Sequence, residues 1–210
     1  MTSSPPVGLI AILRGLTPSE APVIGDALYQ AGIRRLEVPL NSPEPLESIR
    51  LLVERLPADA LVGAGTVVVP ADVDRVHEAG GRMVVAPNTD PAVITRTVEL
   101  GMAPHPGVAT ATEVFTALHA GARALKIFPA PAIGIAGMKA WAATVPPGTA
   151  FLPVGGIDAD TLPAWLAAGA AGAGIGTTLY TPGRGAEDVR TTAETLQRLW
   201  DRHHREEEHA

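Results

Sequence analysis

The chain contains no cysteine among its 210 residues. That absence excludes disulfide bonds, thiolate nucleophiles and cysteine-bound metals. No apolar run approaches the ~20 residues that a membrane-spanning helix needs. The amino-terminal residues 1–15 also lack the basic start and the longer apolar core of a signal peptide. We therefore expect a cytoplasmic protein that has no membrane partner.

Basic residues are in the minority. Lys and Arg total 16 against 22 Asp and Glu, which gives a formal net charge of −6. Binding to nucleic acid needs a basic face, so we expect no nucleic-acid partner. The 46% of hydrophobic residues suffices for one sizeable core. We expect a single domain over residues 1–200 and a charged tail over residues 201–210, either a fraying helix end or a solvated segment.

Short apolar runs alternate with longer amphipathic segments along the chain. The runs predict eight strands, at residues 9–15, 34–40, 61–67, 82–88, 102–108, 123–129, 151–157 and 172–178. The intervening segments predict helices at residues 17–32, 42–56, 89–101, 110–121 and 158–169. The first of these helices has Thr17 as its expected N-cap, Pro18 at its first position and Glu20 three residues after the cap. Ser42 opens the second helix segment in the same way.

Eight strand–helix units in a chain of this length fit a small (β/α)8 barrel, an α/β fold of a single domain. The alternative is an open doubly wound sheet, which usually has fewer strands and a glycine-rich turn after its first strand. The segment "AILRGLTP" contains no such G-x-G-x-x-G pattern, and glycines collect instead after the late strands. These two observations favour the barrel.

Two charged residues lie within apolar strands. Lys126 in "RALKIFP" and Glu37 in "RRLEVPL" each stand between apolar neighbours that suit the helix layer, so both should face the barrel interior. Both lie near the carboxyl ends of their strands, where barrel enzymes have their active sites. A buried lysine with a lowered pKa attacks carbonyl groups, and a nearby carboxylate can move protons. A buried structural ion pair between the two is the alternative.

The last two predicted strands both end in glycine. "VGGI" at 154–157 ends the seventh strand, and "GIGTT" at 174–178 ends the eighth. Barrels frequently bind phosphate at these two loops, through backbone N–H groups that glycine leaves open to an anion. Ordinary loop glycines are the alternative. Their presence at both strand ends favours a phosphate site.

Three further polar residues lie at or near strand ends. Arg14, after the first strand, suits a substrate carboxylate, with a salt bridge to a neighbouring acid as the alternative. Thr66 ends "GAGT", whose small residues leave room for a ligand or for close packing across the barrel. We expect His105 to be a structural residue. The three tryptophans fall in helical segments, where we expect them to pack.

Taken together, these segments resemble the KDPG/KHG aldolases, a family that cleaves phosphorylated 2-keto-3-deoxy sugar acids. The stretch "GARALKIFPAPAIG" is similar to the family's Schiff-base signature and departs from it mainly at Ile127. "GIRRLEVPLNSP", "GAGTV", "APN", "ATATE" and "VGGI" follow in the family's order and spacing. The likeness covers nearly the whole chain, from "IAILRG" to about Trp200.

The resemblance implies a role for each matching residue. Lys126 would form the Schiff base and Glu37 would be the acid/base. The substrate-binding residues it implies are Arg14 and Thr66 at the keto-acid end, Pro87 and Val154 along the substrate, and Gly155, Gly156, Gly176 and Thr177 at the phosphate. It also implies a homotrimer that needs no metal and no cofactor.

Two departures indicate a branch of the family. Glu37 is followed by Pro39 and Asn41, where the gluconate-type enzymes usually have Thr and Arg, and Val154 replaces their Thr. Both departures are similar to the galactonate branch, so the expected substrate is 2-dehydro-3-deoxy-6-phosphogalactonate, which would be cleaved to pyruvate and glyceraldehyde 3-phosphate. The gluconate epimer and 4-hydroxy-2-oxoglutarate remain alternative substrates. A phosphate-binding barrel with isomerase or synthase chemistry and a non-catalytic barrel that binds phosphosugar acids remain open, since fold does not fix function.

Overall fold

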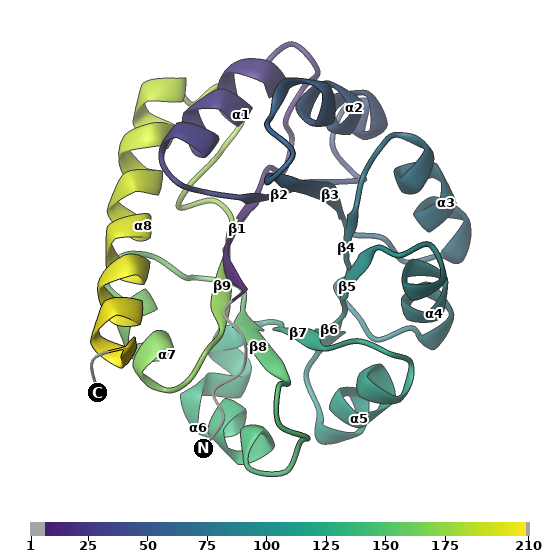
Figure 1. Cartoon of the computed structure of the whole chain (residues 1–210), viewed down its shortest axis with the longest axis vertical. Helices are drawn as coiled ribbons and strands as arrows, with labels where there is room; N and C mark the ends of the chain where they lie inside the picture. Colours follow the sequence, from purple (N-terminus) through teal and green to yellow (C-terminus); the bar gives the residue numbers. More distant parts are fainter. Residues whose placement is uncertain (1–6, 209–210) are drawn as a thin grey trace.

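The computed structural model of the chain describes residues 7–208. In that part of the chain, a ring of parallel strands is surrounded by helices (Figure 1). The strands are β1 (Gly8–Ile12), β2 (Arg35–Pro39), β3 (Leu61–Gly65), β4 (Met83–Val85), β5 (Ala103–His105), β6 (Gly107–Val108), β7 (Ala124–Ile127), β8 (Ala150–Pro153) and β9 (Gly172–Ile175). The helices are α1 (Ala21–Gln30), α2 (Pro45–Arg55), α3 (Pro70–Glu78), α4 (Pro91–Glu99), α5 (Ala111–His119), α6 (Ala130–Ala142), α7 (Leu162–Ala167) and α8 (Ala186–Glu208).

The strands close into the predicted barrel. Six of them pair in the order β5-β4-β3-β2-β1-β9 and three in the order β6-β7-β8. A single parallel bridge between Val154 and Gly174 connects β8 to β9. β5 and β6 are two parts of the one strand predicted at 102–108, which is interrupted at Pro106 because proline has no N–H for the ladder. The single-domain (β/α)8 prediction is therefore confirmed.

The predicted strands are all present, but several end earlier than expected. β3 stops at Gly65, and the next residue, Thr66, has a left-handed backbone with φ 59°. β9 likewise stops at Ile175, three residues before the end of its apolar run. These residues leave the ladder at the carboxyl end of the barrel and form the loops there. Local sequence does not show where a strand ends and its loop begins.

The predicted helix starts at Thr17 and Ser42 are wrong. Residues 17–20 form a turn, and α1 begins at Ala21 with Glu20 as its N-cap. The Thr17 hydroxyl donates to Glu20 Oε2 at 2.6 Å, so the two expected capping partners meet, but they do so before the helix. α2 begins at Pro45, and the Ser42 hydroxyl instead accepts a hydrogen bond from the Gly15 amide at 2.9 Å.

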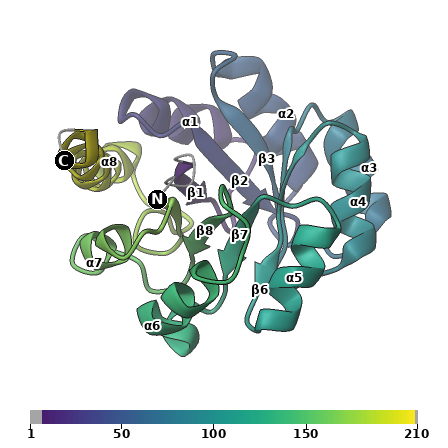
Figure 2. The ribbon, with the colours of Figure 1, turned by 60° about the horizontal axis from the view of Figure 1, so that its bottom comes forward.

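Apolar packing occupies both sides of the strands. The larger core lies between the strands and the helices, and a smaller one fills the barrel interior. The interior core comprises Ile10, Met83, Val85 and Leu152. Helix α8 packs against α1 and α7 and continues without a break past residue 200 to Glu208 (Figure 2). Within residues 7–208, no helix is both long enough and apolar enough to cross a membrane.

Candidate active site

Lys126 and Glu37 both lie in the barrel interior. Lys126 is on β7, between the backbones of Gly107 and Leu152, and its residue is only 8% exposed. Glu37 is the middle residue of β2 and is 1% exposed. Among the described residues, no direct ion pair joins the two, and Glu37 Oε2 has no hydrogen-bond partner. The structure thus gives no support to a closed structural ion pair.

Burial shifts the pKa of both groups toward their neutral forms. Loss of hydration raises the pKa of Glu37 to about 7, although the positive charges of Lys126 and Arg14 oppose that rise. Loss of hydration also lowers the pKa of the Lys126 amine, and only the Glu37 charge opposes that fall. The Lys126 Nζ lies 4.8 Å from the centre of the Phe128 ring. A neutral amine and a carboxyl group that titrates near neutrality are the forms that nucleophilic and acid/base chemistry require.

A cavity of about 200 Å³ opens at the carboxyl end of the barrel, next to Lys126. Its lining residues are Ile12, Arg14, Thr66, Pro87, Lys126, Phe128, Val154, Gly155, Gly156, Ile157, Gly176, Thr177 and Thr178. The barrel thus brings the predicted Lys126, Arg14, Thr66, Pro87 and Val154 into one space, together with the four residues predicted for phosphate. Glu37 is the exception, because it is buried and does not line the cavity.

Arg14 is held in place by a neutral partner. Its Nη1 donates a hydrogen bond of 2.7 Å to the side-chain oxygen of Asn41, and the described residues give it no acidic partner. The next residue, Gly15, is tied to the same loop through the Ser42 hydroxyl. An amide orients the guanidinium without neutralising it. The Asn41 amide therefore does not compete with an anionic ligand for the Arg14 charge at the edge of the cavity.

The loop after β8 has a backbone that favours glycine. Gly155 and Gly156 have φ values of 104° and 67°. A side chain is strained at such angles, so glycine is the suitable residue at both positions. Outside helices and strands, the described part of the chain shows no hydrogen bond donated by the amides of Gly156 and Thr177. These two cavity-lining N–H groups can therefore bind an anion.

A family model described as KDPG and KHG aldolase matches residues 6–192 of this chain. The chain belongs to that family.

Individual relatives agree with this family match. The chain is 48% identical to 2-dehydro-3-deoxy-6-phosphogalactonate aldolase of Escherichia coli (strain K12) over 179 residues, 85% of this chain and 87% of the relative. It is 43% identical to a solved structure described as "Native KDPGal structure", with a TM-score of 0.93, and the match covers 98% of this chain and 100% of that one. A designed cube-shaped protein cage, built "by fusing symmetric oligomeric domains", also matches at 43% identity and a TM-score of 0.93 over 99% of this chain and 76% of that chain.

Some residues of this aldolase-family site were missed from sequence. They are Ile12, Phe128, Ile157 and Thr178, which line the cavity, and Gly65, which lies against Glu37. Alternation along the strands was a usable signal for two of them. Ile12 follows Ile10 by two residues on β1, and Phe128 follows Lys126 by two, so each faces the same way as an interior residue. Gly65 lies in "GAGT", whose small residues indicated close packing or room for a ligand, but its contact with Glu37 depends on the neighbouring strand.

His105 and the tryptophans are structural, as expected. His105 is 4% exposed, its Nδ1 lies 3.3 Å from the Ala103 carbonyl oxygen, and burial lowers its pKa to about 4. It is therefore neutral at physiological pH, and it does not line the cavity. Trp165 and Trp200 are buried in the outer core, and Trp141 packs at its edge.

Proposed function

We propose that this chain is a class I aldolase that cleaves 2-dehydro-3-deoxy-6-phosphogalactonate to pyruvate and D-glyceraldehyde 3-phosphate. The proposal depends on the surroundings of Lys126. This lysine is nearly buried, its pKa is lowered, and it lines a cavity at the carboxyl end of the barrel. Glu37 is buried nearby. Such an amine is a nucleophile toward a keto group. The name of the Escherichia coli relative supports the choice of substrate.

The reaction begins with attack of the neutral Lys126 amine on the C2 ketone of the substrate. Water leaves and a protonated imine forms, which is an electron sink. The proton of the C4 hydroxyl then passes to Glu37, through water because Glu37 does not line the cavity, as the C3–C4 bond breaks. Glyceraldehyde 3-phosphate departs, and the bond electrons remain in an enamine. Protonation at C3 and hydrolysis of the imine release pyruvate and restore the amine.

The cavity offers suitable groups for both ends of the substrate. Arg14 would bind the carboxylate at the keto-acid end and the Thr66 hydroxyl would donate a hydrogen bond there, since both residues line the cavity. The backbone of Gly155, Gly156, Gly176 and Thr177 would hold the phosphate. The amides of Gly156 and Thr177 are the donors that support this assignment.

The gluconate epimer and 4-hydroxy-2-oxoglutarate are the alternative substrates. Val154 lines the cavity and has no hydroxyl that could bind a C4 hydroxyl of the gluconate orientation. This observation favours the galactonate epimer. A non-catalytic phosphosugar-acid sensor would not need the combination of a buried amine with a lowered pKa and a carboxyl group that titrates near neutrality.

The proposal includes the assembly and the location of the enzyme. We infer a homotrimer, which is supported in its coarser form by the symmetric oligomeric domains from which the matching cage was built. Exposed apolar side chains of Val68, Val69, Phe115 and Phe128 offer material for contacts between copies.

A cytoplasmic location follows from a charged phosphorylated substrate, which does not cross membranes. No metal or cofactor is required by the imine mechanism, and residues 1–200 would form the catalytic domain ahead of the charged segment 201–210.

Trapping with borohydride in the presence of pyruvate tests the proposal. Reduction of the imine should add a stable pyruvate-derived mass to one residue, Lys126, as located by peptide mass spectrometry. Lys139 is the internal control, because it is exposed on α6 and lies outside the cavity. Labelling at Lys139 instead, or at no lysine, would overturn the mechanism.

A further inference from the structure

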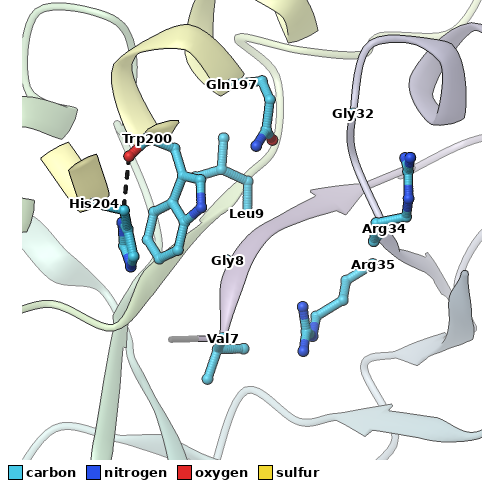
Figure 3. A pocket seen from close by; sticks show the side chains of 9 residues that line it. All are labelled: Val7, Gly8, Leu9, Gly32, Arg34, Arg35, Gln197, Trp200 and His204. Carbon is cyan, nitrogen blue, oxygen red and sulfur yellow. Dashed lines mark hydrogen bonds between the residues drawn. The ribbon is translucent and has the colours of Figure 1, made fainter. Parts of the chain in front are cut away.

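A second cavity lies at the amino end of the barrel, away from Lys126. It has a volume of about 280 Å³, and it includes Gly8 and Arg35, the first residues of β1 and β2 (Figure 3). Its lining residues are Val7, Gly8, Leu9, Gly32, Arg34, Arg35, Gln197, Trp200 and His204. The aldolase reaction proposed above uses none of them.

Arg35 is a cation without a partner in this cavity. Its side chain is half-buried, and within residues 7–208 no hydrogen bond or ion pair of its guanidinium is found. The Arg35 guanidinium lies against β1. A Cβ added at Gly8 would be only 3.5 Å from Arg35 Nη1. Burial lowers the pKa of the guanidinium but leaves it charged. A partly buried charge that lacks a counterion is costly, so it favours a bound anion.

The neighbouring Arg34, unlike Arg35, has partners for its guanidinium. Its Nε pairs with Asp59 Oδ2 at 3.0 Å, its Nη1 donates to the Tyr29 carbonyl at 2.8 Å, and its guanidinium lies 3.9 Å from the centre of the Tyr29 ring. Figure 3 shows the Arg34 and Arg35 side chains pointing in different directions. Asp59 is thus occupied elsewhere and does not neutralise Arg35.

On α8, Asp201 is the described acidic residue next in sequence to the lining residue Trp200. Asp201 accepts a hydrogen bond of 2.8 Å from Gln197 Nε2 and does not line the cavity. No acidic residue is among the described residues that form the lining. Among the described lining residues, the cavity therefore holds Arg35 unpaired and Arg34 paired with Asp59, and no carboxylate.

The wall opposite Arg35 is aromatic and largely apolar. Trp200 lies on α8 with its indole beside Leu9 and above Val7 in Figure 3. The His204 ring packs against Trp200 with centroids 3.8 Å apart and ring planes tilted by 36°. Its Nδ1 lies 3.3 Å from the Trp200 carbonyl oxygen, which helps to hold the two rings in place. An aromatic wall of this kind suits a flat apolar body, which leaves the polar end of a ligand to Arg35.

We propose that this cavity is a second ligand site, which takes a small organic oxyanion whose carboxylate or phosphate pairs with Arg35 and whose apolar body packs against Trp200. The planar fork of a guanidinium binds either oxyanion through two hydrogen bonds. The cavity volume is large enough for a ligand of about ten heavy atoms and too small for a nucleotide or a peptide segment. Binding here is independent of the aldolase reaction.

The test titrates the full chain with three probes that share one ring: benzoate, phenyl phosphate and benzamide. The signal is the indole N–H resonance of Trp200 in a proton–nitrogen spectrum, identified by its loss in Trp200→Phe. Benzoate or phenyl phosphate should shift this resonance in a saturable way, and the stronger of the two identifies the oxyanion. Benzamide, which is neutral and of the same shape as benzoate, should bind at least about tenfold more weakly, as expected when a charge-assisted pair is lost.

Two charge-matched variants locate the binding group. Arg35→Gln should weaken the binding of the anionic probe by at least about tenfold. Arg82→Gln, which removes the same charge just before β4, should leave it unchanged, because Arg82 is exposed and donates to the carbonyls of His77 and Gly81. Arg35→Gln should also keep its aldolase activity and be at least as stable as the wild type, because no ion pair is lost. Equal binding of benzoate and benzamide, an unmoved Trp200 signal, or undiminished binding in Arg35→Gln would overturn the proposal.

Discussion

The carboxylate of Glu37 occupies the space that a side chain at position 65 would need. A Cβ added to Gly65 would overlap Glu37 Oε2. The two residues lie on adjacent strands, since β2 pairs with β3 along its whole length. The position of the proposed acid/base therefore depends on the absence of a side chain on the neighbouring strand.

Gly65→Ala should impair catalysis by displacing that carboxylate. We expect turnover to fall by a factor on the order of 10²–10⁴, as for loss of an acid/base group, while borohydride still traps pyruvate on Lys126. Gly185→Ala is the control, because its Cβ would meet only Asp188 Oδ2 at 3.7 Å. Steady-state kinetics and trapping on both variants check this expectation. An alanine variant with normal turnover would mean that Glu37 need not stay where it is.

Glu37→Gln removes the proton-transfer group but keeps its shape. If Glu37 moves the C4 hydroxyl proton, turnover should again fall by a factor on the order of 10²–10⁴, with imine formation less affected. If Glu37 only balances the charge of Lys126, the main change should be in stability. The measurement is kcat on protein whose folding has been checked by circular dichroism. A folded variant with near-normal kcat refutes the acid/base role.

The raised pKa of Glu37 also predicts how stability depends on pH. The folded pKa of about 7 lies above the unfolded value of 4.5, so folding favours the protonated form. The stability from this group is present in full below the unfolded pKa and is lost as pH rises through about 7. The loss is at most about 3 to 4 kcal/mol, since each pKa unit corresponds to about 1.4 kcal/mol.

Urea unfolding of the wild type and Glu37→Gln at about pH 5 and about pH 8 measures how much the titration of Glu37 contributes to the free energy of unfolding. Glutamine has no charge to bury, so the variant should gain stability relative to the wild type as pH rises. Titrating groups that do not interact with Glu37 are shared by the two proteins and cancel in the difference, whereas Lys126, whose pKa the Glu37 charge raises, contributes to it. A difference in unfolding free energy that stays constant or shrinks toward pH 8 contradicts the raised pKa.

Val154→Thr should move the substrate preference toward the gluconate epimer. Threonine has nearly the shape of valine and adds a hydroxyl in the cavity, where it can pair with a C4 hydroxyl of that orientation. The ratio of kcat/KM for the two epimers should shift by roughly 1–2 kcal/mol if one modest hydrogen bond is gained. Both epimers are assayed on both proteins, with Val154→Ala as a control that changes size without adding a hydroxyl. The explanation is wrong if alanine produces the same shift, or if the wild type already strongly prefers gluconate.

The sequence alone determined the barrel and the main chemical group of the site. Alternating apolar runs and amphipathic segments predict eight strand–helix units, because that periodicity is a local property of the chain. The inward direction of Lys126 and Glu37 follows from alternation along a single strand in the same way. Glycines at two strand ends indicated the loops that border the cavity.

Only the tertiary structure decided how those residues meet. The space for Glu37 beside Gly65, the hydrogen bond from Arg14 to Asn41 and the unpaired Arg35 near Trp200 each join segments that are far apart in the sequence. The helices also begin at Ala21 and Pro45, a few residues after the capping residues that the sequence indicated. Local patterns report which way a side chain faces within its own element. Which groups lie within contact distance, and which charge remains unpaired, depends on the closure of the barrel.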